Sequence, residues 1–407
     1  EILRAIAEDI SLSDEKMLEN IAITAMTGKG AETAKEKLSK LVVSAVKQVA
    51  EKSSDGTITI DSDNIKLEKK FGDSVDDTEL VKGIILDKEK AHSAMPRIVE
   101  KAKVALVDAA LEIKDTEIDA KIQITDPMQM QAFLDQEEKM LRDMVNKVIA
   151  SGANVLFCQK GIDDMAQHFL AKAGIFAARR VKKSDLEKLA KATGAKIVSN
   201  LVDLSLSDLG HAGIVEEIKV GEEEMIYVRD CKNPKAVTIL VRGGTSHIVD
   251  EVKRALEDAI GDVVSAIKVG KIVGGAAACE VEISRGLRKY AESLSGREQL
   301  AVQAFANAIE VIPRTLAENG GLDPIDVITE LRSAHDKNQK WAGINVFSGK
   351  VMDSLKLGVI EPLKIKTQAI SSASEVAIMI LRIDDVIAGS APSSRSHGRD
   401  MPDMPPM

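Results

Sequence analysis

The stretch that decides the fold is Ser295-Gly-Arg-Glu-Gln-Leu-Ala-Val-Gln-Ala-Phe-Ala-Asn-Ala-Ile-Glu-Val-Ile-Pro-Arg-Thr-Leu-Ala-Glu-Asn-Gly-Gly-Leu-Asp-Pro324. Its apolar residues leave almost no polar face on a helix, so we expect a helix that is buried on nearly all sides. Pro313 should break this helix, and the run Asn319-Gly320-Gly321 before Pro324 indicates a tight turn. Such a helix belongs deep inside a larger domain. The apolar positions are Leu300, Val302, Phe305, Ile309 and Ile312.

The length, charge and composition of the chain limit the classes of function that it can have. A chain of 407 residues is long enough for two or three domains with a proper core. The 55 basic and 64 acidic residues give a net charge of −9, and no basic stripe with interleaved aromatic residues occurs, which argues against a nucleic-acid partner. No apolar run approaches the ~20 residues needed to cross a bilayer, so no membrane partner is expected.

The cysteines and histidines indicate no metal site. The three cysteines have no CxxC spacing, which is typical of a reducing, cytoplasmic compartment and not of a structural metal. Cys158 lies in an apolar strand pattern, where a small buried thiol is the ordinary interpretation and a nucleophile the minor alternative. The six histidines are scattered, with no pair at zinc-binding spacing.

The pattern along the chain predicts a multidomain α+β protein. Residues 1–55 read as helical, and residues 71–238 alternate strands with helices in the manner of an α/β unit. A long amphipathic helix opening at Asp126-Pro127 is inserted in this unit, because Asp is a good N-cap and Pro suits the first helical position. A strand at 237–241 leads into a helix at 246–260. The section from 274 to 388 is mostly helical, and the proline-rich end is expected to be flexible.

Two segments could carry chemistry when the residues are taken alone. The sequence Thr27-Gly-Lys-Gly30 could place an ammonium and free backbone N–H groups at a phosphate, although a turn that ends a helix is the more common meaning of such a sequence. The neighbours Glu257 and Asp258 lie near the end of a predicted helix, where solvent-exposed carboxylates are the ordinary reading. The residues by themselves do not establish a mechanism.

Several separate segments resemble the group II chaperonins, the family that includes the archaeal thermosome. The resemblance covers essentially the whole chain, and its segments occur in the family's order. Besides the opening stretch they are Thr24–Glu32, Val75–Gly83, Ser151–Asp163, Val359–Ile370 and Leu381–Ile387.

The resemblance implies a division into equatorial, intermediate and apical domains. The equatorial part is expected to be mainly helical, the intermediate domain small, and the apical domain an α/β unit that bears a helical protrusion. In order along the chain, the expected boundaries are 1–14 for a remnant of the equatorial domain, 15–83 for the first part of the intermediate domain, 84–243 for the apical domain with a helical lid at about 123–151, 244–272 for the second part of the intermediate domain, 273–388 for the C-terminal half of the equatorial domain, and 389–407 for a flexible tail. Hinges are expected at Gly72-Asp73 and Gly243-Gly244.

The resemblance also implies the function of a chaperone that uses ATP and Mg²⁺ and encloses unfolded client proteins in a double ring of identical or related subunits. Asp258 matches the carboxylate that positions the attacking water, a role that phosphoryl transfer requires. The helix that carries Met165, Phe169 and Leu170 resembles the client-facing helix, since apolar residues suit the binding of unfolded chains. The residues implied to line the nucleotide are Gly28, Lys29, Gly275, Asn345, Glu361 and Lys366; Lys29 is implied to sense the γ-phosphate, and Glu361 to bind the ribose hydroxyls.

Two departures from the family pattern bear on activity. Gly275-Ala276-Ala277-Ala278 stands where the family shows Gly-Gly-Gly-Ala, so two added methyl groups are expected to weaken nucleotide binding. The family's phosphate-binding loop and its magnesium-binding Gly-Asp-Gly-Thr-Thr segment do not occur, so we expect a chain that lacks the N-terminal part of the equatorial domain and does not hydrolyse ATP alone. The alternative is a holdase or scaffold that binds exposed apolar segments without nucleotide.

Overall fold

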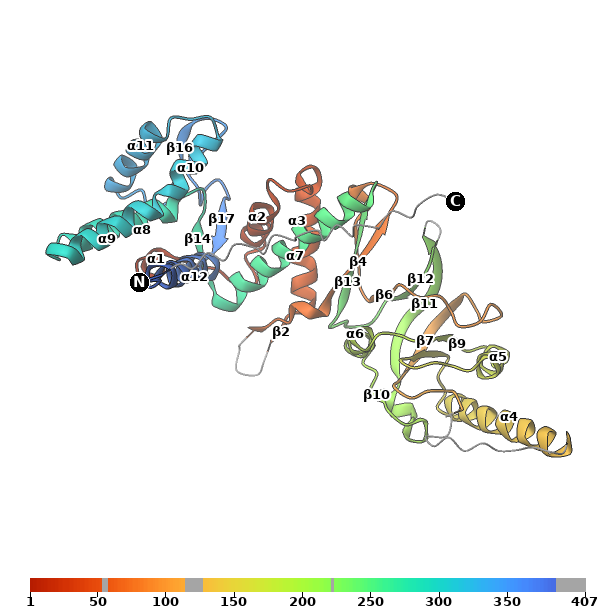
Figure 1. The fold of residues 1–407 in the computed structure, drawn as a ribbon. Helices are drawn as coiled ribbons and strands as arrows, with labels where there is room; N and C mark the ends of the chain where they lie inside the picture. The colour runs from red at the N-terminus through yellow and green to blue at the C-terminus, as the bar shows by residue number, and fades with distance from the viewer. Residues whose placement is uncertain (53–57, 114–126, 221–222, 386–407) are drawn as a thin grey trace, which may run out of the picture. The chain divides into compact units, whose positions relative to one another are not determined.

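The computed structural model describes residues 1–52, 58–113, 127–220 and 223–385. The chain divides into two compact units, Glu1–Ile365 and Lys366–Met407. Figure 1 labels the helices and strands along the chain. The described part of the second unit consists of the helical residues from Lys366 to the end of α12 (Leu363–Leu381) and the residues up to 385. The mixed helix and sheet content confirms the predicted α+β class. The expected flexible tail and the start of the expected lid, 123–126, lie outside the described residues.

One core is built where helices cover a three-stranded sheet. The sheet has the order β4-β13-β5, with β13 parallel to β4 and antiparallel to β5. The longest helix of this core begins after Thr245, whose Oγ1 accepts a hydrogen bond from the N–H of Ile248 (3.3 Å), and ends at Gly270, whose φ of 69° favours glycine. The elements are α2 (Glu15–Met26), α3 (Lys35–Val49), α7 (Ser246–Val269), β4 (Ile65–Phe71), β5 (Glu79–Val81) and β13 (Val237–Gly243).

One strand of this core, β13, lies at a predicted domain boundary. The sequence analysis placed the segment up to residue 243 with the apical α/β unit. In the structure, β13 pairs with β4 from Val237↔Ile65 to Gly243↔Phe71, and its side chains are buried with those of α7. The strand therefore belongs with the segments on either side of the α/β unit. Its run of apolar residues suits a central strand that is buried on both faces.

The α/β unit contains a seven-stranded sheet with the order β6-β12-β11-β7-β8-β9, and β10 pairs with β7. Alternate residues of β7 face opposite layers: Val104 and Leu106 pack in the core with α6, whereas Ala105 and Val107 pack in the core with α4 and α5. The predicted strand–helix alternation is confirmed, but the long strand β11 was not predicted. The bounds are β6 (Ile84–Leu86), β7 (Ile98–Val107), α4 (Pro127–Ala150), β8 (Val155–Cys158), α5 (Asp164–Lys172), β9 (Phe176–Ala178), α6 (Lys183–Thr193), β10 (Ile197–Val198), β11 (Gly210–Val220) and β12 (Glu223–Arg229).

The C-terminal section of the first unit is mostly helical, as predicted. A three-stranded sheet with the order β1-β14-β17 joins the start of the chain to this section. Its elements are α1 (Ile2–Ile6), β1 (Glu8–Asp9), β14 (Lys271–Gly274), α8 (Ala278–Ala291), α9 (Gly296–Ile309), α10 (Val311–Asn319), α11 (Pro324–Asp336), β15 (Ala342–Asn345), β16 (Lys350–Asp353) and β17 (Ile360–Pro362). A small hairpin elsewhere in the unit pairs β2 (Glu51–Lys52) with β3 (Ile58–Thr59).

The prediction of a helix buried on nearly all sides is wrong for the described residues. Leu300 is 66% exposed and Ile312 is 51% exposed, whereas Ile309 is buried. The reason is that α9 packs along α8 on one face, while its other face has no cover among these residues. The helix also ends at Ile309, before Pro313, which lies in the first turn of α10, where a missing N–H costs little.

Candidate functional site

The loop after α2 places a lysine beside α7. Gly28 has a φ of 76°, and its N–H donates to the Glu32 carboxylate (3.0 Å). A Cβ on Gly30 would meet the carboxylate of Glu251 on α7, so any larger residue there would displace the Glu251 side chain. The loop is therefore held against α7 with Lys29 between its two glycines.

Lys29 forms an ion pair with Asp258, although the two residues are 229 positions apart in the sequence. The Asp258 side chain is 59% exposed and that of Lys29 is 36% exposed, so both charged groups remain accessible from solvent. Taken alone, the loop of Lys29 is an ordinary turn and Asp258 is an ordinary surface carboxylate. The ion pair between these two distant segments is what marks this region as a candidate site.

A second carboxylate, Asp262, lies one helical turn further along α7. Residues four apart in a helix lie on the same face, so Asp262 is beside Asp258. Burial of the Asp262 carboxyl, together with the negative charges of Glu361 and Asp258, raises its pKa to about 6, and the Lys29 ammonium opposes the shift. The sequence analysis missed this residue; the spacing of two aspartates at i and i+4 was the signal that could have found it.

The turn between β14 and α8 contains the two departures from the family pattern. Ala276 and Ala277 have φ values of 53° and 66°, in the left-handed region that favours glycine. The N–H of Gly275 donates to the Val359 carbonyl (2.9 Å), and the Ala276 carbonyl accepts from the N–H of Ile344 (2.9 Å). The turn is thus held between β15 and the segment that leads into β17.

Gly275 and Glu361 lie against each other at this turn. A Cβ on Gly275 would stand 2.8 Å from Oε1 of Glu361, so a larger residue at 275 would displace the Glu361 carboxylate. Asn345 ends the strand β15, whose Gly343 packs against Ala276. The Oδ1 atom of Asn345 accepts hydrogen bonds from the N–H groups of the exposed tip of its hairpin. The structure therefore brings Gly275 and Glu361 together, and Asn345 follows the two residues of β15 that contact the same turn.

Lys366 falls in the second compact unit, on α12, and is described there by itself. Glu361, which precedes it by five positions, lies in the first unit on β17. The residues of the predicted site that belong to one unit are therefore Gly28, Lys29, Asp258, Gly275, Asn345 and Glu361.

The predicted client-facing residues on α5 differ in their surroundings. Met165 is 45% exposed. Phe169 is half-buried, and the guanidinium of Arg142 lies over its ring at 4.9 Å from the centroid. Leu170 is fully buried in the core with α4, so it cannot present a surface to a client in this arrangement. Only Met165 and part of Phe169 are available.

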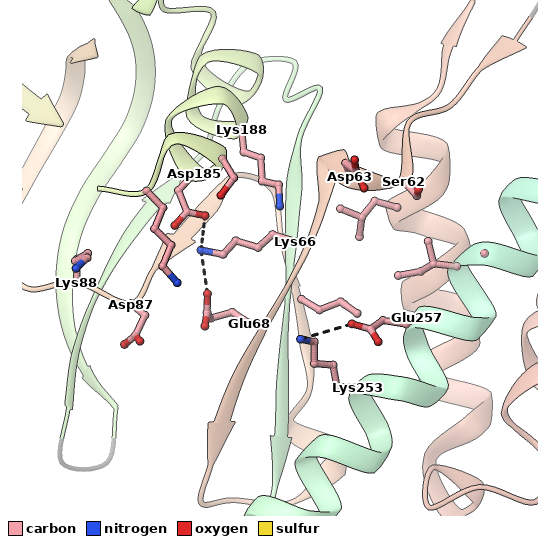
Figure 2. Close-up of a pocket in the computed structure, with 16 residues that line it drawn as sticks. Ser62, Asp63, Lys66, Glu68, Asp87, Lys88, Asp185, Lys188, Lys253 and Glu257 are labelled. Carbon is pink, nitrogen blue, oxygen red and sulfur yellow. Dashed lines mark ion pairs between the residues drawn. The ribbon is translucent and has the colours of Figure 1, made fainter. Parts of the chain in front are cut away.

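A polar pocket of about 760 Å³ lies apart from these residues, between β4, α6 and α7. Figure 2 shows the Lys66 ammonium directed at two carboxylates, Asp185 on α6 and Glu68 on β4, each at 2.9 Å. On the α7 side of the pocket, Lys253 pairs with Glu257 (3.5 Å). The pocket contains none of the residues that the sequence analysis assigned to a site.

Other candidate chemistry is absent from the part of the chain that the structure describes. No group of three or more His, Cys, Asp or Glu side chains is placed there to hold a metal ion. No described helix is long and apolar enough to span a membrane. Cys158 is buried, and burial raises the pKa of its thiol to about 12, so the thiol stays protonated near neutral pH and is a poor nucleophile.

Comparisons with known proteins agree with the resemblance seen in the sequence. Residues 1–390 match the TCP-1/cpn60 chaperonin family. The chain is 60% identical to thermosome subunit beta of Archaeoglobus fulgidus, over 100% of this chain and 75% of that protein. It is 62% identical to a thermosome subunit of Methanopyrus kandleri, over 95% of this chain and 71% of that protein. The open-state monomer of a group II chaperonin from Methanococcoides burtonii superposes with a TM-score of 0.67 at 51% identity, covering 94% of this chain and 89% of that one.

Proposed function

The chain belongs to the TCP-1/cpn60 chaperonin family and is a chaperonin subunit, and from this premise we propose that the subunit binds and hydrolyses ATP at the site around Lys29 and Asp258. The observation that carries the proposal is the ion pair between these two residues, which joins the loop after α2 to α7. A loop that meets a catalytic carboxylate in this way can report the presence of a phosphate to the helix that bears the carboxylate.

Each residue has a role in this proposal. Asp258 orients the attacking water and accepts its proton, which phosphoryl transfer needs for an in-line nucleophile. Lys29 leaves Asp258 to contact the γ-phosphate, so the carboxylate is released only when ATP is present. Glu361 accepts hydrogen bonds from the ribose hydroxyls. The residues of the first unit that are proposed to line the rest of the nucleotide are Gly28, Gly275 and Asn345. No step assigned to these residues depends on a metal ion, although ATP is expected to act together with Mg²⁺.

The proposed consequence of the ATP cycle is a domain movement that encloses a client protein. The glycines at Gly72 and Gly243 are proposed hinges; the N–H of Gly72 donates to the Gly243 carbonyl (3.0 Å), so both hinge strands lie at one place. The exposed apolar side chain of Met165 supports client binding on α5. The exposed apolar residues of α9 support assembly with related subunits in a double ring, and a cytoplasmic location is proposed.

The test is the substitution Asp258→Ala in the assembled subunit. We expect nucleotide binding to persist and the turnover rate to fall by about 100-fold or more, because a positioned proton acceptor contributes ~10²–10⁴-fold. Glu257→Ala is the matched control, since it removes the adjacent carboxylate of the same helix and should leave turnover unchanged. Normal turnover in the Asp258→Ala variant would refute the assignment.

One observation favours a second function, a holdase that binds exposed apolar segments without nucleotide. Ala276 and Ala277 place two methyl groups at the turn where the family has glycines. If these methyl groups prevent nucleotide binding, the protein would suppress aggregation of an unfolded client equally well with and without ATP. Light scattering of a chemically unfolded client, measured under both conditions, distinguishes the two functions.

A further inference from the structure

The buried side chain of His335 takes no part in the proposed ATP chemistry, and its surroundings indicate another role. His335 lies near the end of α11, and its side chain is fully buried. Its Nδ1 atom lies 2.6 Å from Oε2 of Glu282 on α8, and its Nε2 atom lies 2.9 Å from the carbonyl oxygen of Ala342, the first residue of β15. Both ring nitrogens are engaged, so the ring connects α8 to β15.

The hydrogen bond between His335 and Ala342 has a fixed direction. A carbonyl oxygen can only accept, so Nε2 of His335 carries a proton and is the donor. On the other side of the ring, Glu282 is held by Arg285, whose Nε and Nη2 atoms donate to its two carboxylate oxygens at 3.2 and 2.5 Å. The carboxylate in turn orients the ring. The chain of contacts from Arg285 through Glu282 and His335 thus ends on the backbone of β15.

The strand β15 holds the turn between β14 and α8. The N–H of Ile344 donates to the Ala276 carbonyl (2.9 Å). A Cβ on Gly343 would stand 2.7 Å from the same carbonyl oxygen, so the backbone of the strand lies directly against the turn. Glu282 lies on α8, which begins immediately after this turn. His335 therefore fixes both the strand that contacts the turn and the helix that follows it.

We propose that His335 is a positioning residue for the nucleotide, because it sets the distance between β15 and α8 and thereby the shape of the turn between β14 and α8. The inference rests on the proposed function, since it assumes that the nucleotide contacts Gly275 in this turn. A residue of this kind acts on the binding of ATP and not on the water that Asp258 orients. Loss of its bond to β15 should therefore raise the dissociation constant and KM and leave kcat at saturating ATP unchanged.

Two substitutions separate the bond to β15 from the bond to α8. The amide group of an asparagine stands near the position of Nδ1 of a histidine, and that of a glutamine near the position of Nε2. His335→Asn should thus keep the contact with Glu282 and lose the one with Ala342, whereas His335→Gln should do the reverse. Both variants lose the ring and one hydrogen bond, so their urea midpoints should fall by similar amounts.

The experiment is isothermal titration calorimetry of the assembled subunit with the non-hydrolysable analogue AMP-PNP and Mg²⁺, together with KM and kcat for ATP. We expect His335→Asn to raise the dissociation constant and KM roughly three- to tenfold, the range of a single hydrogen bond, and His335→Gln to bind nearly as tightly as the wild type. Asp336→Asn is the matched control, since it neutralises the exposed neighbour of His335 on α11 and should bind as the wild type does.

A second measurement uses the wild type and needs no substitution. If the position of the ring favours nucleotide binding, bound nucleotide must favour that position of the ring by the same factor. Exchange of the imidazole C2 hydrogen of His335, followed by mass spectrometry, should therefore be slower with AMP-PNP than without it. This measurement decides the inference where His335→Asn does not assemble.

Two results would overturn the inference and leave the proposed nucleotide site standing. Equal dissociation constants for His335→Asn and His335→Gln would show that the residue supports the fold without positioning the nucleotide. An exchange rate of the His335 ring that AMP-PNP does not change would show that ring and nucleotide are not coupled. If the wild type does not bind AMP-PNP, the nucleotide site itself is wrong, and the inference falls with it.

Discussion

Three consecutive alanines at the start of α8 should respond in three different ways to replacement by glycine. Ala276 has a φ of 53° and is half-buried, and Ala277 has a φ of 66° and is buried, whereas Ala278 is the first residue of α8, with helical backbone angles. A left-handed conformation costs an L-residue roughly 1–2 kcal/mol, and glycine avoids this cost. Against this, glycine loses about 0.4–1 kcal/mol through the greater freedom of the unfolded chain.

The balance differs at each position. Ala276→Gly should stabilise the fold by about 0.5–1 kcal/mol, because relief of the left-handed conformation exceeds the entropy loss. Ala277→Gly should be close to neutral, because about 0.8 kcal/mol of methyl burial is lost as well. Ala278→Gly should destabilise by about 1–2 kcal/mol, because no strain is relieved, a buried methyl is lost, and glycine is a poor helix former.

The assay is the shift of the urea midpoint at constant slope, with the three single variants compared in one series. The same variants should be titrated with AMP-PNP, and the double variant Ala276→Gly, Ala277→Gly is expected to bind it more tightly than the wild type. A loss of stability in Ala276→Gly as large as that in Ala278→Gly would refute the left-handed conformation at 276. Unchanged affinity in the double variant would show that the two methyl groups do not obstruct the nucleotide.

Two further predictions concern residues that the structure places in the interior. Glu310 is 1% exposed and accepts hydrogen bonds from Ser284 (2.8 Å), Arg288 (3.1 Å) and Arg332. Burial alone would raise its pKa, but these hydrogen bonds and the arginine charges outweigh burial and lower it, so its contribution is present above pH 4.5 and is lost as the pH falls through the lowered value. Glu310→Gln should cost about 2–4 kcal/mol at pH 7, because the arginines lose a buried partner but stay partly solvated, and the loss should shrink below pH 4. Leu170→Ala should cost about 2–5 kcal/mol, as expected for a core leucine, whereas Met165→Ser should leave the melting temperature nearly unchanged and weaken client binding; equal effects of these two substitutions on stability would contradict their assignment to core and surface.

The local parts of the fold could be predicted because their signals are local. The strands and helices of the α/β unit follow apolar periodicity within a few residues, and most were found to within a few positions. The helix from residue 246 was predicted to end at 260, before Gly261, yet α7 continues to Val269. A glycine costs a helix only about 1 kcal/mol, and the apolar stripe continues through Val263 and Ile267, which are buried. The burial of the apolar side chains after Gly261 thus outweighs the helix penalty of this one glycine.

Long-range pairing was harder to predict than local structure. The strand β11 carries Glu216 and Glu217 in its middle, so its alternation is interrupted by charge. It is a strand because it pairs on one side with β7 and on the other with β12, and β7 lies about a hundred residues earlier in the chain. The contact between Lys29 and Asp258 is of the same kind. No periodicity in the sequence predicts this ion pair. The resemblance to the chaperonins indicated each residue separately but not the contact between them.

The residues of α9 show why burial itself cannot be inferred from apolar composition alone. Leu300, Phe305 and Ile309 have similar side-chain hydrophobicity, yet only Ile309 is buried, because only that face of the helix meets α8. The composition shows which side chains lower the free energy of the protein when they leave water, by about 25 cal/mol for each Å² of apolar surface. It does not show which surface covers them. In a subunit of a chaperonin, the cover for an apolar face can come from outside the residues considered. The exposed apolar face of α9 gains from burial for the same physical reason as a core, and a contact with a neighbouring subunit would bury it.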